Sequence, residues 1–263
     1  MQIDEAIVPA LPELAVRHLG TDDASAFLDS VAGSVRLRVS GAADPAGTGS
    51  RLGGQPTVPA RFAWPTIGPD TWFEPRPDEG TPLRFLGQVN TSEVNPLLAR
   101  PVLPPDTVLA FFFESSPGGA LLNWTDAWEL AANRIVAVRV REAGLGAPAG
   151  DTASRAHALR PEAVTTVPPI EYWLRRGAPG RDALEALYAE LRPDPVSHPI
   201  RMFGWFDSPP RNWNWAASSN LLLQVTLDPA LELGWSKTSI LYAFIGADSL
   251  AAGPPYRASG RYA

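Results

Sequence analysis

Two arginine–glutamine combinations are the parts of this sequence with side chains that could do chemistry. Arg51 opens an Arg-Leu-Gly-Gly segment and precedes Gln88, and Arg201 opens an Arg-Met-Phe-Gly segment and precedes Gln224. Two guanidinium groups that face one cleft could hold a carboxylate or a phosphate through paired hydrogen bonds. One prediction is therefore a small anionic-ligand receptor or an enzyme, with a cleft between two repeated parts of the chain.

The two glutamines also have a structural explanation, because each lies within an apolar stretch of strand length. A buried amide that finds no partner costs about 1–3 kcal/mol. The side chains of Gln88 and Gln224 therefore need hydrogen-bond partners. They either satisfy the backbone of a neighbouring loop or point into a shared cleft, and the sequence leaves both possibilities open.

A further candidate surface is the aromatic segment Trp213-Asn214-Trp215, which follows Arg211. Tryptophan and arginine are frequent anchors of protein interfaces, and the rings could also stack on a sugar or a peptide. The same segment could instead fold onto a sheet as a packed loop. Arg211, Trp213 and Trp215 complete the set of candidate binding residues.

Signatures of catalysis and of metal binding are missing from the sequence. It has no cysteine, which excludes thiolate catalysis, disulfides and cysteine zinc sites. Its histidines, His18, His157 and His198, are isolated, and it has no Gly-x-Ser-x-Gly segment. We therefore expect no catalytic residue, no metal and no cofactor, and the sequence favours a protein that is not an enzyme.

The elements that must position the candidate residues are short, because 28 prolines and 22 glycines are spread through 263 residues. Apolar spacing predicts helices over 11–19, 24–31 and 181–191. Alternation or continuous apolar runs predict strands over 35–39, 83–89, 108–113, 134–140, 220–227 and 239–245. This mixture of short helices and separate strands predicts an α+β fold.

Three landmarks recur in the same order along the chain: an Arg-x-x-Gly turn, a strand that contains a glutamine, and an aromatic apolar strand. This order predicts an internal duplication into two β-rich units with halves near 35–140 and 195–250, within a single domain over 1–263. The Ala- and Gly-rich residues 142–160 are predicted to be a loop or linker.

Charge and hydropathy limit the partners. The net charge of −6 argues against a nucleic-acid binder, which needs a basic face. No apolar stretch is long enough to span a membrane. The first five residues, Met-Gln-Ile-Asp-Glu, lack the features of a signal peptide, so the predicted location is the cytoplasm.

Several motifs in order resemble the YwqG-like family of uncharacterised bacterial proteins. They are Ser50–Pro56, Trp64-Pro65, Phe85–Val89 and Phe111–Phe113 in the first half, and His198–Gly204, Leu221–Val225 and Leu241–Ile245 in the second. The resemblance covers roughly residues 50–250. It implies an α+β fold with repeated β-rich units and no established enzyme activity.

Relatives of this kind are associated with bacterial toxin–immunity gene sets, so the resemblance implies a non-catalytic protein-binding role, as an immunity-type or accessory factor with a toxin-type or other partner. The sequence departs from the family at Trp235-Ser236-Lys237, where Trp-Gly-Asp is usual. Lysine in place of that acid weakens any proposal for an acidic site in the second half.

Overall fold

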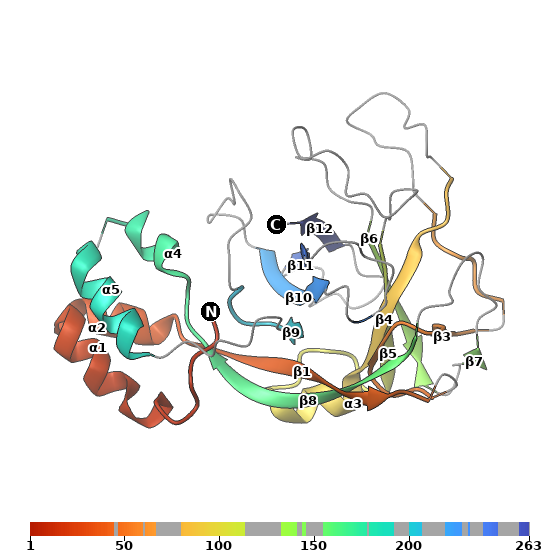
Figure 1. Cartoon of the computed structure of the whole chain (residues 1–263), viewed down its shortest axis with the longest axis horizontal. Helices are drawn as coiled ribbons and strands as arrows, with labels where there is room; N and C mark the ends of the chain where they lie inside the picture. Colours follow the sequence, from red (N-terminus) through yellow and green to blue (C-terminus); the bar gives the residue numbers. More distant parts are fainter. Residues whose placement is uncertain are drawn as a thin grey trace.

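The computed structural model describes residues 1–44, 47–59, 61–66, 80–113, 133–140, 144–145, 155–177, 179–191, 200–206, 219–227, 231, 239–246 and 258–262. These residues form a lobe of helices beside a large curled antiparallel sheet (Figure 1). The fold is α+β, which confirms the predicted class.

The helical lobe is built from two separate parts of the chain. Its helices are η1 (Val8–Ala10), α1 (Leu11–Leu19), α2 (Thr21–Asp29), α4 (Ile170–Leu174) and α5 (Arg181–Glu190). Their apolar sides bury one cluster that includes Phe27, Trp173, Leu184 and Leu187. The predicted bounds of α1 are confirmed, whereas α2 begins three residues earlier than predicted, directly after Gly20.

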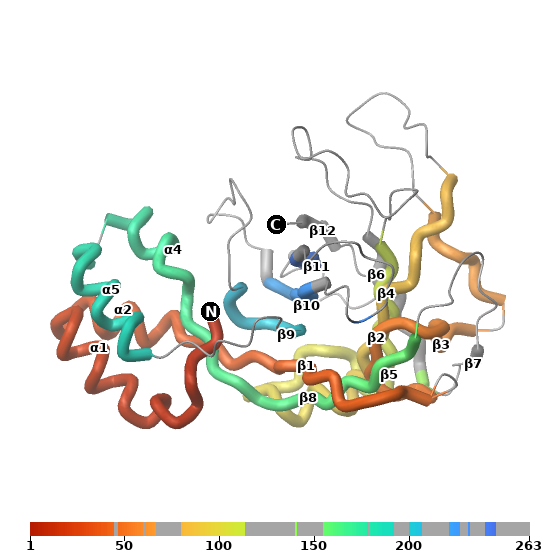
Figure 2. The backbone as a smooth tube through the Cα atoms, viewed as in Figure 1, coloured from red at the N-terminus to blue at the C-terminus, as the bar shows by residue number. Residues whose placement is uncertain are grey.

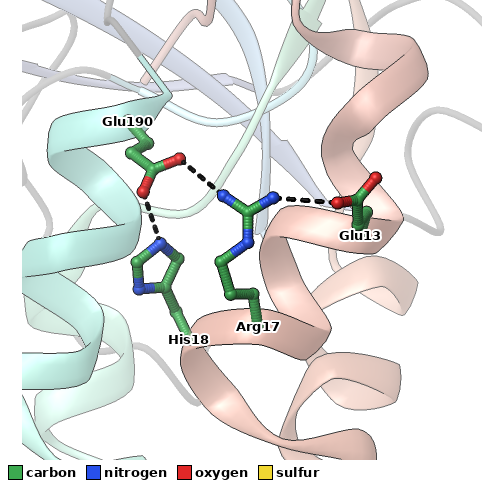
Figure 3. A network of polar contacts seen from close by, with 4 residues as sticks. All are labelled: Glu13, Arg17, His18 and Glu190. Carbon is green, nitrogen blue, oxygen red and sulfur yellow. Dashed lines mark hydrogen bonds and ion pairs between the residues drawn. The ribbon is translucent and has the colours of Figure 1, made fainter.

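A chain of polar contacts joins α1 to α5 on the surface of this lobe (Figure 3). Arg17 donates to Glu13 at 2.8 Å and to Glu190 at 3.4 Å. His18 Nε2 lies 2.9 Å from the other oxygen of Glu190. Exposed pairs of this kind contribute little individually, so the buried cluster does most to hold the lobe together.

The large sheet has ten strands among the described residues, in the order β12-β11-β10-β9-β1-β8-β2-β4-β5-β6, and all neighbours are antiparallel. The strands are β1 (Ala32–Ala42), β2 (Arg51–Leu52), β4 (Arg84–Asn90), β5 (Thr107–Phe113), β6 (Asn133–Arg139), β8 (His157–Thr166), β9 (Ile200–Met202), β10 (Ser219–Leu227), β11 (Ser239–Gly246) and β12 (Ala258–Tyr262). A two-stranded sheet pairs β3 (Thr57–Val58) with β7 (Gly144–Leu145).

The sheet curls around the main apolar core. One buried cluster contains Phe111 of β5 together with Leu241 and Ala243 of β11, although six strands of the sheet separate β5 from β11. The edge strands β6 and β12 also contact each other. The face that carries this cluster is therefore the concave one, and α3 (Thr91–Val94) and η2 (Asn95–Leu97) contribute Val94 and Leu97 to it.

Strands β1 and β8 connect the lobe to the sheet. The chain leaves the helices along β1 and returns to them along β8 (Figure 2). Residues 157–160, which composition assigned to a loop or linker, are the first residues of β8, and residues 144–145 form β7. The sequence did not predict this strand because Pro161 lies within it, and proline argues against a central strand. It is tolerated here since β2 pairs with β8 only at His157 and Ala158.

None of the helices among the described residues combines the length and the apolar character that a membrane crossing requires.

Candidate functional site

Arg51 and Gln88 lie directly opposite each other on β2 and β4. The side chain of Arg51 is buried, with 1% of the residue exposed. Its guanidinium donates to the backbone oxygens of Gly47 and Gln55, and to the hydroxyl of Thr57 at 2.9 Å. From its buried position, Arg51 therefore supports the loop that contains Gly47, Gln55 and Thr57.

The Gln88 amide holds the same loop. Its Oε1 accepts from the backbone N–H of Thr57 at 3.0 Å, and its Nε2 donates to the carbonyl oxygens of Gly49 at 3.1 Å and Gly47 at 3.4 Å. The loop itself would otherwise bury these backbone groups without partners. The sequence left two possibilities open for Gln88. Its described hydrogen bonds go to the backbone of the loop, which is the first of the two.

Glycines allow the backbone to approach this pair closely. Gly53 and Gly54 have φ angles of 66° and 73°, a region that side chains other than glycine seldom adopt. A Cβ atom on Gly87 would lie 2.5 Å from the backbone oxygen of Arg51. The Gly-Gly segment is therefore a structural turn.

Burial sets the electrostatics of Arg51. Removal of the guanidinium from water lowers the pKa of Arg51 to about 10, while the nearby Asp44 carboxylate opposes this shift and raises it. The group stays charged at neutral pH, and carbonyl oxygens and a hydroxyl solvate it in place of water. Its Nη1 and Nη2 atoms already donate to the loop and its Nε is buried, so an anion could reach the guanidinium only if the loop opened.

Arg201 and Gln224 form the second pair, opposite each other on β9 and β10. Arg201 is fully buried and donates to the backbone oxygen of Trp205 at 2.6 Å and to Oε1 of Gln224 at 3.4 Å. Phe203 and Gly204 have φ angles of 61° and 67°. This turn thus has the same backbone region at the same two positions as Gly53 and Gly54.

The two pairs lie on one face of the sheet but at separate places. Residues directly opposite on neighbouring strands share a face, and Arg51 faces Ala158 on β8 while Arg201 faces Arg36 on β1. Leu52 and Met202, the next residues, belong to the concave cluster, so both arginines lie on the convex face. Strands β1 and β8 separate them, a sideways distance of about 14 Å at the usual strand spacing.

The structure therefore brings each arginine together with its own glutamine and keeps the two pairs apart, each beneath its own turn. Arg211, Trp213 and Trp215, the remaining predicted binding residues, lie outside the described residues.

Sequence reasoning missed the role of Trp205. Its indole Nε1 donates to the backbone oxygen of Ser30 at 2.7 Å, and its backbone N–H donates to Thr166 Oγ1 at 3.1 Å. Its ring lies 4.7 Å from that of Tyr172, measured between centroids. Trp205 thus fastens the second arginine turn to the helical lobe. Its place directly after the Arg-x-x-Gly turn was the available signal.

A second group of arginines was also missed. Arg36 and Arg38 of β1 and Arg160 of β8 lie on the convex face with Glu162, outside the two turns. The alternation of β1 places its arginines on one face, but only the pairing with β8 brings Arg160 to them. Within the described part of the chain, no group of three or more Asp, Glu or His residues is placed to hold a metal ion.

Comparisons with curated proteins and with family models identify the family of this chain. No curated protein matches the sequence. The family model described as "Domain of unknown function (DUF1963)" matches residues 50–254, a region that begins one residue before Arg51 and includes both arginine–glutamine pairs. This match spans more than half of the chain. The chain therefore belongs to the DUF1963 family.

Proposed function

We propose that this protein acts by binding another protein, as a non-catalytic, immunity-type or accessory factor of the YwqG-like kind. The observation that carries the proposal is the internal use of Arg51, Gln88 and Arg201. Their described hydrogen bonds go to the loops that they support and, for Arg201, also to Gln224 on the neighbouring strand. Polar groups that serve a small-molecule site converge on a concave pocket, whereas these support two separate loops.

The alternative, an anionic-ligand receptor with a cleft between the repeats, would need both guanidinium groups to face one space. Arg51 and Arg201 are fully or almost fully buried and separated by two strands. Accessible charge on the same convex face comes from other arginines, since Arg160 is exposed and the side chain of Arg38 is 58% exposed. Exposed charge on the convex face of a sheet suits a macromolecular partner.

The proposal is tested by native mass spectrometry of the full-length tagged protein, purified gently from the cells that produce it. We expect a second protein in a fixed ratio to this chain, and none in a parallel purification of the tag alone. A small-molecule adduct in place of a second protein would contradict the proposal and would favour the receptor alternative.

We also propose that the sheet arose by internal duplication. The strand series β1-β2-β4-β5-β6 would correspond to β8-β9-β10-β11-β12. Several matches support this: the opposed arginine–glutamine pairs, the paired positive φ angles, and a register shift in β4 and β10 just before each glutamine, between Phe85 and Gly87 and between Leu221 and Leu223. The halves would then begin near 32 and 157, so the second would start earlier than the landmarks alone predict.

A further inference from the structure

The convex face of the sheet carries four charged side chains outside the two arginine turns. Arg36 and Arg38 lie on β1, and Arg160 and Glu162 lie on β8. Arg36 is directly opposite Glu162, and Arg38 is directly opposite Arg160. These four side chains share one face because opposed residues do so, and we call them the arginine face.

Positive charge exceeds negative charge on the arginine face. One oxygen of Glu162, Oε2, accepts from Arg36 at 2.9 Å and lies 3.4 Å from Nε of Arg38. Arg160 is exposed and makes no ion pair within the described part of the chain. The side chain of Arg38 is 58% exposed. Two guanidinium groups are therefore accessible, with one shared carboxylate near them.

Cross-strand pairing gives no reason for Arg38 to lie opposite Arg160. Like charges directly opposite each other on antiparallel strands are unfavourable. Arg38 and Arg160 also occupy matching places relative to the two turns. Val35, opposite Met202, lies three residues before Arg38, and His157, opposite Leu52, lies three residues before Arg160. The arginine pair thus lies at the centre of the convex face, between the two turns.

The shape and charge of this surface indicate its partner. A small ligand prefers a concave pocket, whereas these side chains stand on the outside of a curled sheet. A nucleic acid would need many neutralised phosphates along a basic face, whereas the whole chain carries a net charge of −6. A compact group of two accessible arginines matches one or two carboxylates, which guanidinium groups bind through paired hydrogen bonds.

We propose that the arginine face binds an acidic segment of a partner protein, with Asp or Glu carboxylates held by Arg38 and Arg160. This inference rests on the proposed protein-binding function and names the chemistry of the partner. Glu162, which also pairs with Arg36, lies beside Arg38 and leaves Arg160 to the partner.

Charged side chains also prevent open strand edges from pairing with other chains, so a test must separate that role from binding. Arg160→Glu does so, because a charge remains at the strand while its sign is reversed. The new carboxylate would face Arg38, which replaces an unfavourable cross-strand pair with a favourable one. We expect this variant to melt at the same temperature as the wild type or slightly above it.

The test is titration of the isotope-labelled protein with hexaglutamate at low ionic strength, followed by the NMR resonances of the arginine Nε–H groups. We expect saturable shifts at Arg38 and Arg160, and an affinity at least tenfold weaker in Arg160→Glu. Arg100→Glu, the same charge change at an exposed loop residue, should bind as the wild type does. Arg160→Glu should instead gain binding of hexalysine.

Equal binding of hexaglutamate by the wild type and Arg160→Glu would overturn the proposal, as would no shift at either arginine. Tighter binding of an RNA oligonucleotide of equal charge at these residues would replace the acidic protein segment with a nucleic acid. Native mass spectrometry tests the proposed function independently. A partner that still binds the Arg160→Glu variant would leave the proposed function standing and would remove only the proposed role of the arginine face.

Discussion

Gln88 on β4 lies directly opposite Arg51 on β2, and the two side chains converge on one carbonyl oxygen, that of Gly47. Each also binds Thr57, Arg51 through the hydroxyl and Gln88 through the backbone N–H. Two side chains from neighbouring strands thereby hold the loop that contains Gly47 and Thr57. This arrangement makes the pair a structural support, and its consequences can be measured.

Loss of either arginine should destabilise the fold. Arg51→Ala and Arg201→Ala each remove donors from buried carbonyl groups, and we expect each to lower the free energy of unfolding by about 3 kcal/mol. Arg160→Ala, at an exposed position, should change it by less than about 0.5 kcal/mol. Urea unfolding followed by circular dichroism measures all three. Wild-type stability in Arg51→Ala would show that the loop does not depend on this group.

The second turn should depend on Gly204 as strongly as on its arginine. Gly204 has a φ angle of 67°, and a Cβ atom there would lie 2.4 Å from Thr166 Oγ1. Gly204→Ala should therefore cost about 2 kcal/mol or more of stability. Gly33→Ala is the matched control, because a Cβ on Gly33 meets no atom within 4 Å. Equal decreases of the melting temperature in Gly204→Ala and Gly33→Ala would argue against the observed turn geometry.

Trp205 should control how firmly the helical lobe is attached. Trp205→Phe removes the hydrogen bond to the Ser30 carbonyl and keeps an aromatic ring beside Tyr172. We expect a loss of about 1 kcal/mol, with faster hydrogen exchange in α2 and α4 and little change in β4 and β5. Exchange that rises uniformly over the whole chain would mean that lobe and sheet open as one unit.

Alkaline pH should weaken the fold through Tyr188. Burial raises the pKa of Tyr188 above its ordinary value of 10.0, and its hydroxyl donates to the Pro168 carbonyl. The unfolded chain then releases this proton before the folded one does, so the stabilisation is complete below pH 10 and is lost as pH rises above it. From pH 8.5 to 10.5, the wild type should lose about 0.8 kcal/mol more than Tyr188→Phe.

Urea unfolding of both proteins at the two pH values gives this difference directly. Arg51, whose lowered pKa favours the folded state as pH rises through 10, is common to both proteins and cancels. An equal loss in wild type and Tyr188→Phe would contradict a protonated, buried Tyr188.

Local pattern predicted much of the secondary structure. The buried strand β5 and the helix α1 follow from a continuous apolar run and from helical spacing. Strand β8 was missed because Pro161 lies in its middle and because its partner β1 is more than a hundred residues distant. Signals of local sequence cannot supply that pairing.

The same limit applies to the candidate site. Arg51 and Gln88 stand out in the sequence because polar residues are unusual in buried strands, and both are indeed buried. Whether they face a cleft or a loop depends on the face of the sheet and on the loop above it, which only the fold determines. The opposition of Arg38 and Arg160 depends in turn on the register between β1 and β8.

Site-specific cross-linking in the producing cells tests most directly whether this protein binds a partner protein through its convex face. A photo-reactive residue would replace Ser40, an exposed residue of β1 two positions after Arg38, and in a control would replace Arg100. We expect one discrete cross-linked protein from position 40, joined through an acidic peptide, and none from position 100. No discrete product from position 40, or the same product from both positions, would contradict it.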